Sequence, residues 1–232
     1  MNSTVLTKDY LNQIILSDNN DIRLKFQENF AKEINQFIDD LFVVHEDYKI
    51  LDKYSREDWQ KVWVAGYTYK AIQDVMNAFT LFIHGFILPS GNSMRQFHES
   101  TAMAIMLSNK KLKNSEEFIK DPPTFRVSTV FKKIENNLSS FELNQVGWKA
   151  FCDNKDFYHQ FSHSSAFSVS SLANFETRQN FVGFGPFYDK GKEKQYLQEI
   201  NQMIKALGIF RNIISGIKVQ LGILELEEHR TL

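Results

Sequence analysis

Two short polar clusters interrupt otherwise apolar helical sequence and carry the residue types that could do chemistry. The first, Arg95-Gln96-Phe97-His98-Glu99, follows a stretch from Ala71 to Met94 whose only formal charge is Asp74. The second is Tyr158-His159-Gln160-Phe161-Ser162-His163. Charged and imidazole groups rarely enter a protein core unless they are paired. Each cluster therefore needs either a structural or a chemical reason.

The first cluster contains the parts of an acid–base site. Arg95 could hold a phosphate, His98 could move protons, and Glu99 could orient either group. Arg95 and Glu99 are four residues apart, so on a helix they share one face. The structural alternative is an Arg95–Glu99 ion pair that fixes helix packing, with His98 facing a loop.

The second cluster could complete a polar pocket between two helices. Tyr158, Ser162 and His163 have hydrogen-bonding groups that could reach the first cluster. The alternative is a helix end, where Ser and His side chains satisfy free backbone groups. We take Arg95, Glu99, Tyr158 and His163 as the candidate catalytic residues.

A metal site is the weaker interpretation of the histidines. His159 and His163 have the i, i+4 spacing of two imidazole ligands on one helix. In the H-E-x-x-H motif a glutamate acts as general base at the second position, where this chain has Gln160. A metal-dependent hydrolase would use His98, Glu99, His159 and His163. We expect no metal and no cofactor.

Composition excludes several classes of protein. The net charge of −1 provides no global field toward nucleic acid or an anionic membrane, so such binding would need a local patch. Cys152 is the single cysteine, which excludes an intrachain disulfide and favours a reducing compartment. The N-terminus lacks a signal-peptide pattern, and the apolar run from Ala78 to Leu88 is too short to span a bilayer. We expect a soluble, cytoplasmic protein without a membrane partner.

Periodic apolar residues predict an all-α protein, an up-and-down helical bundle. We expect helices over 4–16 and 22–44, and a third that opens at a Ser55–Asp58 capping box, runs into Phe82 and is the central buried helix. Leu88-Pro89 should end or kink that helix, and a fourth follows over 95–107. We find no linker, so we predict one domain over 1–232, with N-terminal helices in 1–55 and a core in 56–232.

The second half of the chain ends in the clearest helix. A loop is expected over 110–123, then a helix opening at Asp121-Pro122-Pro123 and helical sequence over 141–161. The Gly/Pro/Phe-rich segment 180–187 is the best candidate for extended structure. Apolar residues then recur in four heptads at Tyr196, Ile200, Met203, Leu207, Phe210, Ile214, Ile217, Leu221 and Leu224.

The order of these segments resembles a known group of proteins. An apolar, glycine-containing helix leads to Arg-x-x-x-Glu (85–99), and a Tyr/Ser/His segment (158–163), a Gly-Pro-aromatic turn (185–188) and a long terminal helix follow. This order is similar to uncharacterised bacterial all-helical proteins grouped loosely with the HEPN (higher eukaryote and prokaryote nucleotide-binding) bundles. The resemblance covers roughly residues 60–224.

The resemblance implies a bacterial phage-defence or toxin–antitoxin protein that binds or cleaves RNA as a homodimer. HEPN nucleases resemble each other in an Arg followed by four to six residues and then His, and no Arg here has a His at that distance. Cleavage would need Arg95 of one helix and His163 of another. The alternative is a non-catalytic, dimeric helical interaction module with a protein partner, whose polar clusters only specify packing.

Overall fold

The structure is a computed structural model that describes residues 16–56, 58–109, 127–161 and 186–223. It also describes residues 173–174 and 181–182, and the isolated helical residues 8, 9, 12, 116, 118 and 120. The predicted helix over 4–16, the loop over 110–123, the helix start at 121–123, and residues Ser162, His163 and Leu224 lie wholly or mostly outside the described part.

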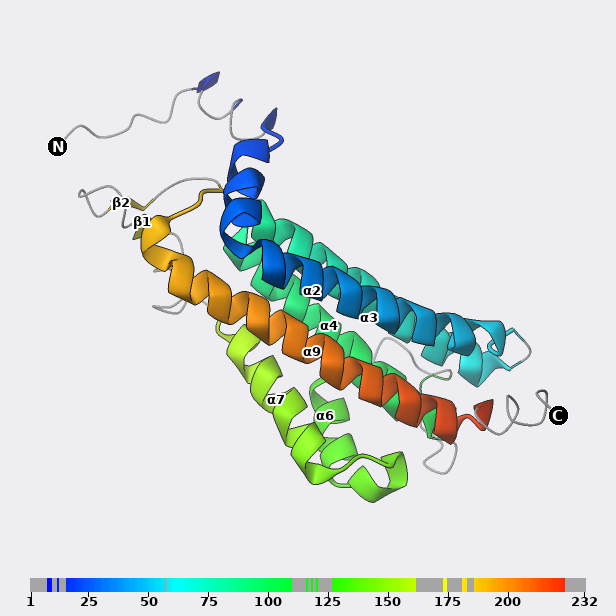
Figure 1. Cartoon of the computed structure of the whole chain (residues 1–232). Coiled ribbons are helices and arrows are strands. Elements are labelled where there is room, and N and C mark those ends of the chain that lie inside the picture. Colours follow the sequence, from blue (N-terminus) through cyan, green and yellow to red (C-terminus); the bar gives the residue numbers. More distant parts are fainter. Residues whose placement is uncertain are drawn as a thin grey trace.

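The described chain is all-α apart from one pair of two-residue strands. The α-helices are α2 (Asn20–Lys53), α3 (Trp59–Ile83), α4 (Ile87–Ser108), α6 (Val127–Glu135), α7 (Gln145–His159) and α9 (Glu193–Gln220). Two short 3₁₀ helices, η2 (Leu138–Phe141) and η3 (Lys190–Lys192), precede α7 and α9. Strand β1 (Ala173–Asn174) pairs antiparallel with β2 (Phe181–Val182), which lies in the segment expected to be extended. Figure 1 shows α2, α9 and α7 side by side, with α3 and α4 behind them.

Helix α2 forms because apolar residues recur every three or four positions over more than 30 residues. Its buried residues include six of the predicted stripe, and the helix bends at Phe30, whose φ of −132° is not helical. Phe26 places its ring 5.1 Å from that of Phe82 and 5.0 Å from that of Tyr196. The N-terminal helix therefore shares its core with α3 and α9.

The start of α3 differs in detail from the prediction. Asp58 is its N-cap, and its carboxylate accepts hydrogen bonds from the backbone N–H groups of Gln60 and Lys61. The predicted capping role of Ser55 is wrong, because its hydroxyl donates instead to the Asp52 carbonyl at the end of α2. The two helices are joined by a turn that contains one cap for each.

The junction of α3 and α4 lies earlier than predicted. Helix α3 ends at Ile83, and Gly85 makes the turn with a φ of +83°, a conformation that a Cβ would strain. Pro89 lies in the first turn of α4, where its missing N–H costs no helical hydrogen bond, so it neither ends nor kinks the helix. Arg95 is therefore in the third turn of α4.

Helix α4, rather than α3, is the central helix. The run Ser100–Ser108 is buried throughout, whereas α3 exposes Met76, Asn77 and Thr80. Helices α3, α6, α7 and α9 all pack on α4. The prediction that α3 is the central buried helix is therefore wrong.

Helices α7 and α9 close the core. The segment predicted to be helical over 141–161 is divided by Glu142, whose φ of +54° ends η2 before Asn144 caps α7. Helix α9 keeps its predicted stripe against the core, with Leu221 just past its last turn. The buried stripe residues are Tyr196, Ile200, Met203, Leu207, Phe210, Ile214, Ile217 and Leu221.

Candidate functional site

Arg95 and Glu99 form an ion pair on the surface of α4. Arg95 Nε lies 3.0 Å from Glu99 Oε1, and the two side chains are 40 % and 32 % exposed. Both side chains belong to one helix, so the pair spans a single turn of α4. The expected Arg95–Glu99 ion pair is therefore present, but it is partly exposed and does not cross a helix–helix interface. The guanidinium stays open to solvent beside its carboxylate.

His98 points the other way, into the core between α4 and α7. Its Nδ1 lies 2.7 Å from the Met94 carbonyl oxygen and its Nε2 lies 2.8 Å from Asn154 Oδ1. The ring also packs against Phe151, with centroids 5.0 Å apart. Burial lowers the pKa of His98 to about 4, so the imidazole is neutral at pH 7 and its single N–H can donate to only one of these two oxygen atoms. The expectation that His98 faces a loop is wrong.

Tyr158 is also buried. It belongs to α7, whereas Arg95 belongs to α4. Its hydroxyl donates a long hydrogen bond, 3.4 Å, to the backbone carbonyl of Glu199 on α9. Its ring centroid lies 6.0 Å from that of His98. Burial raises the pKa of Tyr158 well above its ordinary value, so the phenol does not serve as a base near neutral pH.

Asn154 is the residue that joins these groups, and the sequence analysis missed it. Its Nδ2 donates to the Gln202 backbone carbonyl (3.1 Å) and to Gln202 Oε1 (2.9 Å), while Oδ1 meets His98. One amide thus connects α4, α7 and α9. A signal was present, because Asn154 lies three residues after Phe151 and four before Tyr158, on the apolar stripe of α7.

A second missed group lies on α9 beside Tyr158. Glu199 is buried, and its Oε1 accepts a hydrogen bond from Gln195 Nε2 at 3.2 Å. Burial raises the pKa of Glu199 to about 8, and the opposing attraction of nearby Lys192 is smaller. Lys192 is itself buried, which lowers its pKa. Glu199 lies three residues after Tyr196 and four before Met203, and this spacing on the apolar stripe could have identified it.

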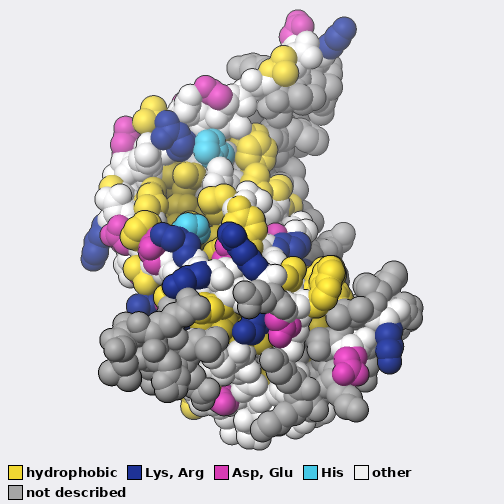
Figure 2. All heavy atoms as spheres, turned by 90° about the vertical axis from the view of Figure 1, so that its right-hand side faces the viewer, with side chains coloured by type: hydrophobic (Ala, Val, Ile, Leu, Met, Phe, Trp, Pro, Cys, Tyr) yellow, Lys and Arg dark blue, Asp and Glu magenta, His cyan; other side chains and the backbone are white. Residues whose placement is uncertain are grey.

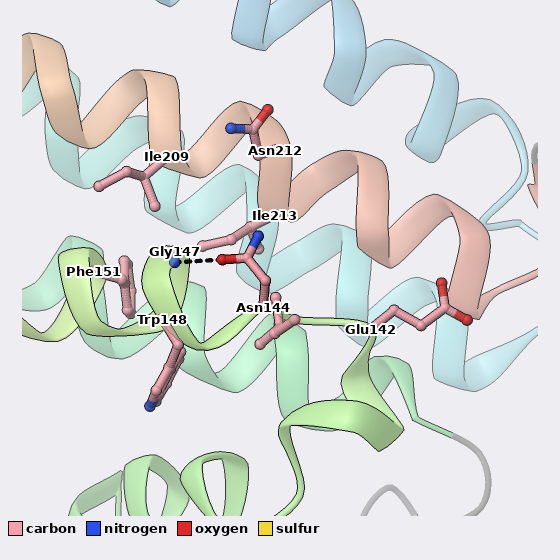
Figure 3. A pocket seen from close by; sticks show the side chains of 9 residues that line it. Glu142, Asn144, Gly147, Trp148, Phe151, Ile209, Asn212 and Ile213 are labelled. Atoms are coloured by element: carbon pink, nitrogen blue, oxygen red, sulfur yellow. Dashed lines mark hydrogen bonds between the residues drawn. The ribbon is translucent and has the colours of Figure 1, made fainter.

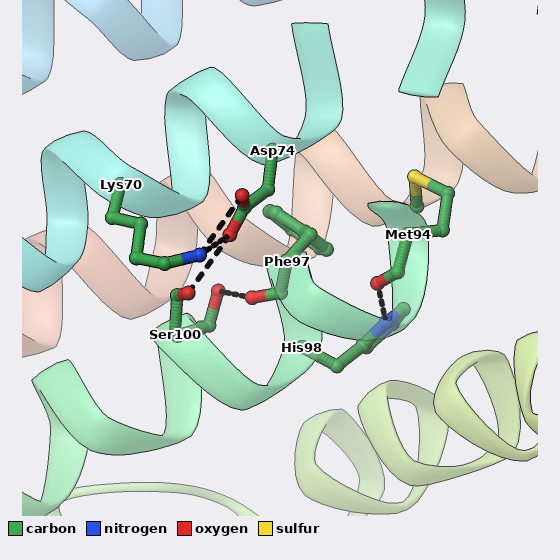
Figure 4. Close-up of polar contacts among 7 residues, drawn as sticks. Lys70, Asp74, Met94, Phe97, His98 and Ser100 are labelled. Carbon is green, nitrogen blue, oxygen red and sulfur yellow. Dashed lines mark hydrogen bonds and ion pairs between the residues drawn. The ribbon is translucent and has the colours of Figure 1, made fainter. Parts of the chain in front are cut away.

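Asp74, the only charged residue between Ala71 and Met94, links α3 to α4 through a hydrogen bond. Its Oδ2 accepts hydrogen bonds from Lys70 Nζ (2.7 Å) and from Ser100 Oγ (2.9 Å). Figure 4 shows this contact on one side of α4 and His98, turned toward Met94, on another. The polar side chains of α4 are thus distributed around the helix.

Close backbone approaches bring the segments of the resemblance to one end of the bundle. A Cβ on Gly85 would lie 2.8 Å from the backbone nitrogen of Phe187, and one on Gly91 would overlap the ring of Phe161. The described parts of 85–99, 158–161 and 186–188 therefore meet. Within this end, however, Arg95 and Glu99 lie at the surface while His98 and Tyr158 lie inside.

The proposed metal ligands do not gather in the described chain. His98 faces Asn154, Glu99 faces Arg95, and His159 is exposed at the end of α7, while His163 lies outside the described residues. Among the described residues no group of three or more His, Cys, Asp or Glu side chains is placed to hold a metal ion.

Two hollows lie away from both polar clusters. Figure 3 shows one of about 120 Å³ at the N-terminus of α7, where Asn144 Oδ1 accepts from Gly147 N–H and Ile209 and Ile213 of α9 form a wall. An open groove of about 450 Å³ lies between α2 and α9, where Asp47 pairs with Arg211 and Lys218. Neither hollow contains a residue of the candidate set.

No protein-family model, curated protein or solved structure matches this chain. None of its described helices combines the length and the apolar character that crossing a membrane requires.

Proposed function

We propose that the protein is a non-catalytic helical interaction module whose polar clusters hold its helices together. The observation that carries this proposal is the placement of His98, whose two ring nitrogens both face oxygen atoms inside the core. A general acid or base must reach a substrate and needs a pKa near the working pH. His98, with a pKa of about 4, and the buried Tyr158 satisfy neither requirement at pH 7.

Surface charge supports the same proposal. Figure 2 shows basic and acidic side chains interspersed over the described part of the face at which α2 ends and α3 begins. Nucleic-acid binding usually depends on a contiguous basic field. The net charge of −1 provides none at the level of the whole chain.

The test is binding and cleavage of a labelled single-stranded 20-nucleotide RNA at low salt. The expected result is neither cleavage nor saturable binding for the wild-type protein. Cleavage or tight binding that Arg95→Ala abolishes, with unchanged thermal stability, would overturn the proposal. Lys149→Ala is the matched control, because Lys149 forms a comparable i, i+4 surface pair with Asp153 on α7.

A second candidate function is that of a HEPN-like, RNA-binding or RNA-cleaving protein of bacterial defence. Its support is the meeting of segments 85–99, 158–161 and 186–188 at one end of the bundle, together with the half-exposed Arg95 guanidinium. In this case Arg95 would bind a backbone phosphate, and Glu99 would orient it. The same RNA experiment separates the two candidates.

A further inference from the structure

Large apolar side chains remain exposed along the line where α2 meets α3. Phe42 and Ile38 on α2 are 63 % and 53 % exposed. The same face of α3 exposes Val62, Tyr69 and Met76, each by about two fifths of its surface. We call these five residues the α2–α3 seam.

The pairing of the two helices makes the seam continuous. The rings of Phe37 and Phe79 stack 3.7 Å apart, and those of Tyr48 and Tyr69 lie 5.5 Å apart, so α2 and α3 are antiparallel. This register places Met76 level with a point between Ile38 and Phe42, and Tyr69 and Val62 farther along the helix pair. The apolar side chains of the two helices are therefore neighbours on one surface.

The packing of the chain itself does not explain the seam. The buried face of α2 passes through Phe37, Val44 and Leu51. At about 100° per residue, Ile38 and Phe42 lie more than a quarter turn away from that face. Single exposed apolar residues are common on soluble proteins, but a contiguous row is typical of an interaction surface.

We propose that the α2–α3 seam binds a second copy of this chain in a two-fold dimer. Five large side chains, each about half exposed, contribute on the order of 500 Å² of the roughly 800 Å² that each partner buries in a standard interface. The polar residues around them supply the remainder. In a two-fold arrangement the α2–α3 seam of one copy packs against the α2–α3 seam of the other.

Charge and shape also fit a second copy. Two chains of net charge −1 approach each other with little mutual repulsion. An antiparallel helix pair laid on the same pair from another copy makes a four-helix layer, a packing in which apolar faces of this width are buried. This inference rests on the proposed function, because it names the partner of the interaction module.

The experiment is sedimentation velocity of the full chain from about 1 to 100 µM. We expect a concentration-dependent dimer, and at least a tenfold increase in its dissociation constant in Phe42→Glu and in Ile38→Glu. Val146→Glu is the matched control, because Val146 is 80 % exposed on α7 and should leave association unchanged. Circular dichroism confirms that each variant is folded.

Three outcomes would overturn the inference. These are a monomer at every concentration, a dimer that both seam variants leave intact, and a monomer whose seam instead binds neutral phosphatidylcholine vesicles. The RNA assay reports on Arg95 and sedimentation reports on the seam. A failure of the dimer and a failure of the proposed function are therefore distinguishable.

Discussion

Two polar groups on the same helix differ in almost every physical respect. Arg95 and His98 are three residues apart on α4, about 60° apart around its axis. The first forms a surface ion pair, whereas the second is buried, with its ring nitrogens 2.7 Å from the Met94 carbonyl oxygen and 2.8 Å from Asn154 Oδ1. The comparison teaches that residue type and spacing alone do not place a side chain in a site. A difference of about 60° around the helix axis is enough to place one side chain in solvent and the other in the core.

The two places also differ in energy. A solvent-exposed ion pair contributes about 0–1 kcal/mol, because water screens it and ordering the side chains costs entropy. A buried polar group that loses its partner costs about 1–3 kcal/mol for each group left unsatisfied. The His98–Asn154–Gln202 network is therefore expected to dominate stability, and the Arg95–Glu99 pair to matter little.

The largest effect is expected at the centre of the network. Asn154→Ala removes the partner of both His98 and Gln202 and should lower the free energy of unfolding by about 4 kcal/mol. Chemical denaturation at pH 7 measures this loss. Asn77→Ala, at an exposed position of α3, is the control and should change stability by about 0.5 kcal/mol or less. A loss below about 1 kcal/mol for Asn154→Ala would contradict the claim that the buried network stabilises the fold more than the surface ion pair does.

The next effect is a dependence on pH. The folded pKa of His98 is about 4 and its ordinary value is 6.5, so the unfolded chain binds the proton more tightly. His98 therefore stabilises the fold fully above pH 6.5, and this contribution is lost as the pH falls toward 4. The loss amounts to about 3 kcal/mol. His98→Gln should flatten the stability profile between pH 6.5 and 4, while exposed His45→Gln keeps the wild-type slope. Equal slopes in all three proteins would refute the assignment.

An effect of comparable size and opposite sign is expected from Glu199. Its folded pKa is about 8 and its ordinary value is 4.5, so its contribution is present below pH 4.5 and is lost as the pH rises through 8. Glu199→Gln keeps the acceptor for Gln195 and removes the titration. It should raise the free energy of unfolding by about 4 kcal/mol at pH 8 and by less than about 1 kcal/mol at pH 5. Exposed Glu28→Gln should show no such difference between the two pH values, and destabilisation of Glu199→Gln at pH 8 would be the contrary result.

The smallest effect is expected at the surface pair. Arg95→Ala should lower the free energy of unfolding by less than about 1 kcal/mol, and 1 M salt should reduce the difference further because it screens the pair. Thermal and chemical unfolding with and without salt measure it. A loss of several kcal/mol would mean that the guanidinium is buried in solution.

The positions and buried faces of the helices could be predicted from the sequence better than the residues at which the helices begin. The stripe of α2 and the heptads of α9 are confirmed because apolar periodicity directly reports which face of a helix is buried. Helix starts were less certain. Ser55 and Asp58 are both good caps, and only the turn geometry decides between them. Pro89 is compatible with a kink or with a first turn, and the neighbouring Gly85 selects the second.

The candidate site was predictable in part. The Arg95–Glu99 contact follows from their spacing, because both atoms belong to one helix. The environment of His98 does not follow, since it depends on α7 supplying Asn154 from 56 residues away. Glu199 was not identified, because a carboxylate is ordinarily found at the surface and its burial here depends on the elements that pack on α9. Tertiary packing decides the environments of His98 and Glu199, whereas the Arg95–Glu99 contact is local to one helix.

The central claim is that the residues selected for chemistry act in two separate places. A double-mutant cycle on the free energy of unfolding tests it directly, with Arg95→Ala, Tyr158→Phe and the double variant measured at pH 7. Independent sites add to within about 0.5 kcal/mol, whereas residues that share partners couple more strongly. The account predicts a coupling energy below about 0.5 kcal/mol. A coupling above about 1 kcal/mol would show that Arg95 and Tyr158 belong to one site and would contradict it.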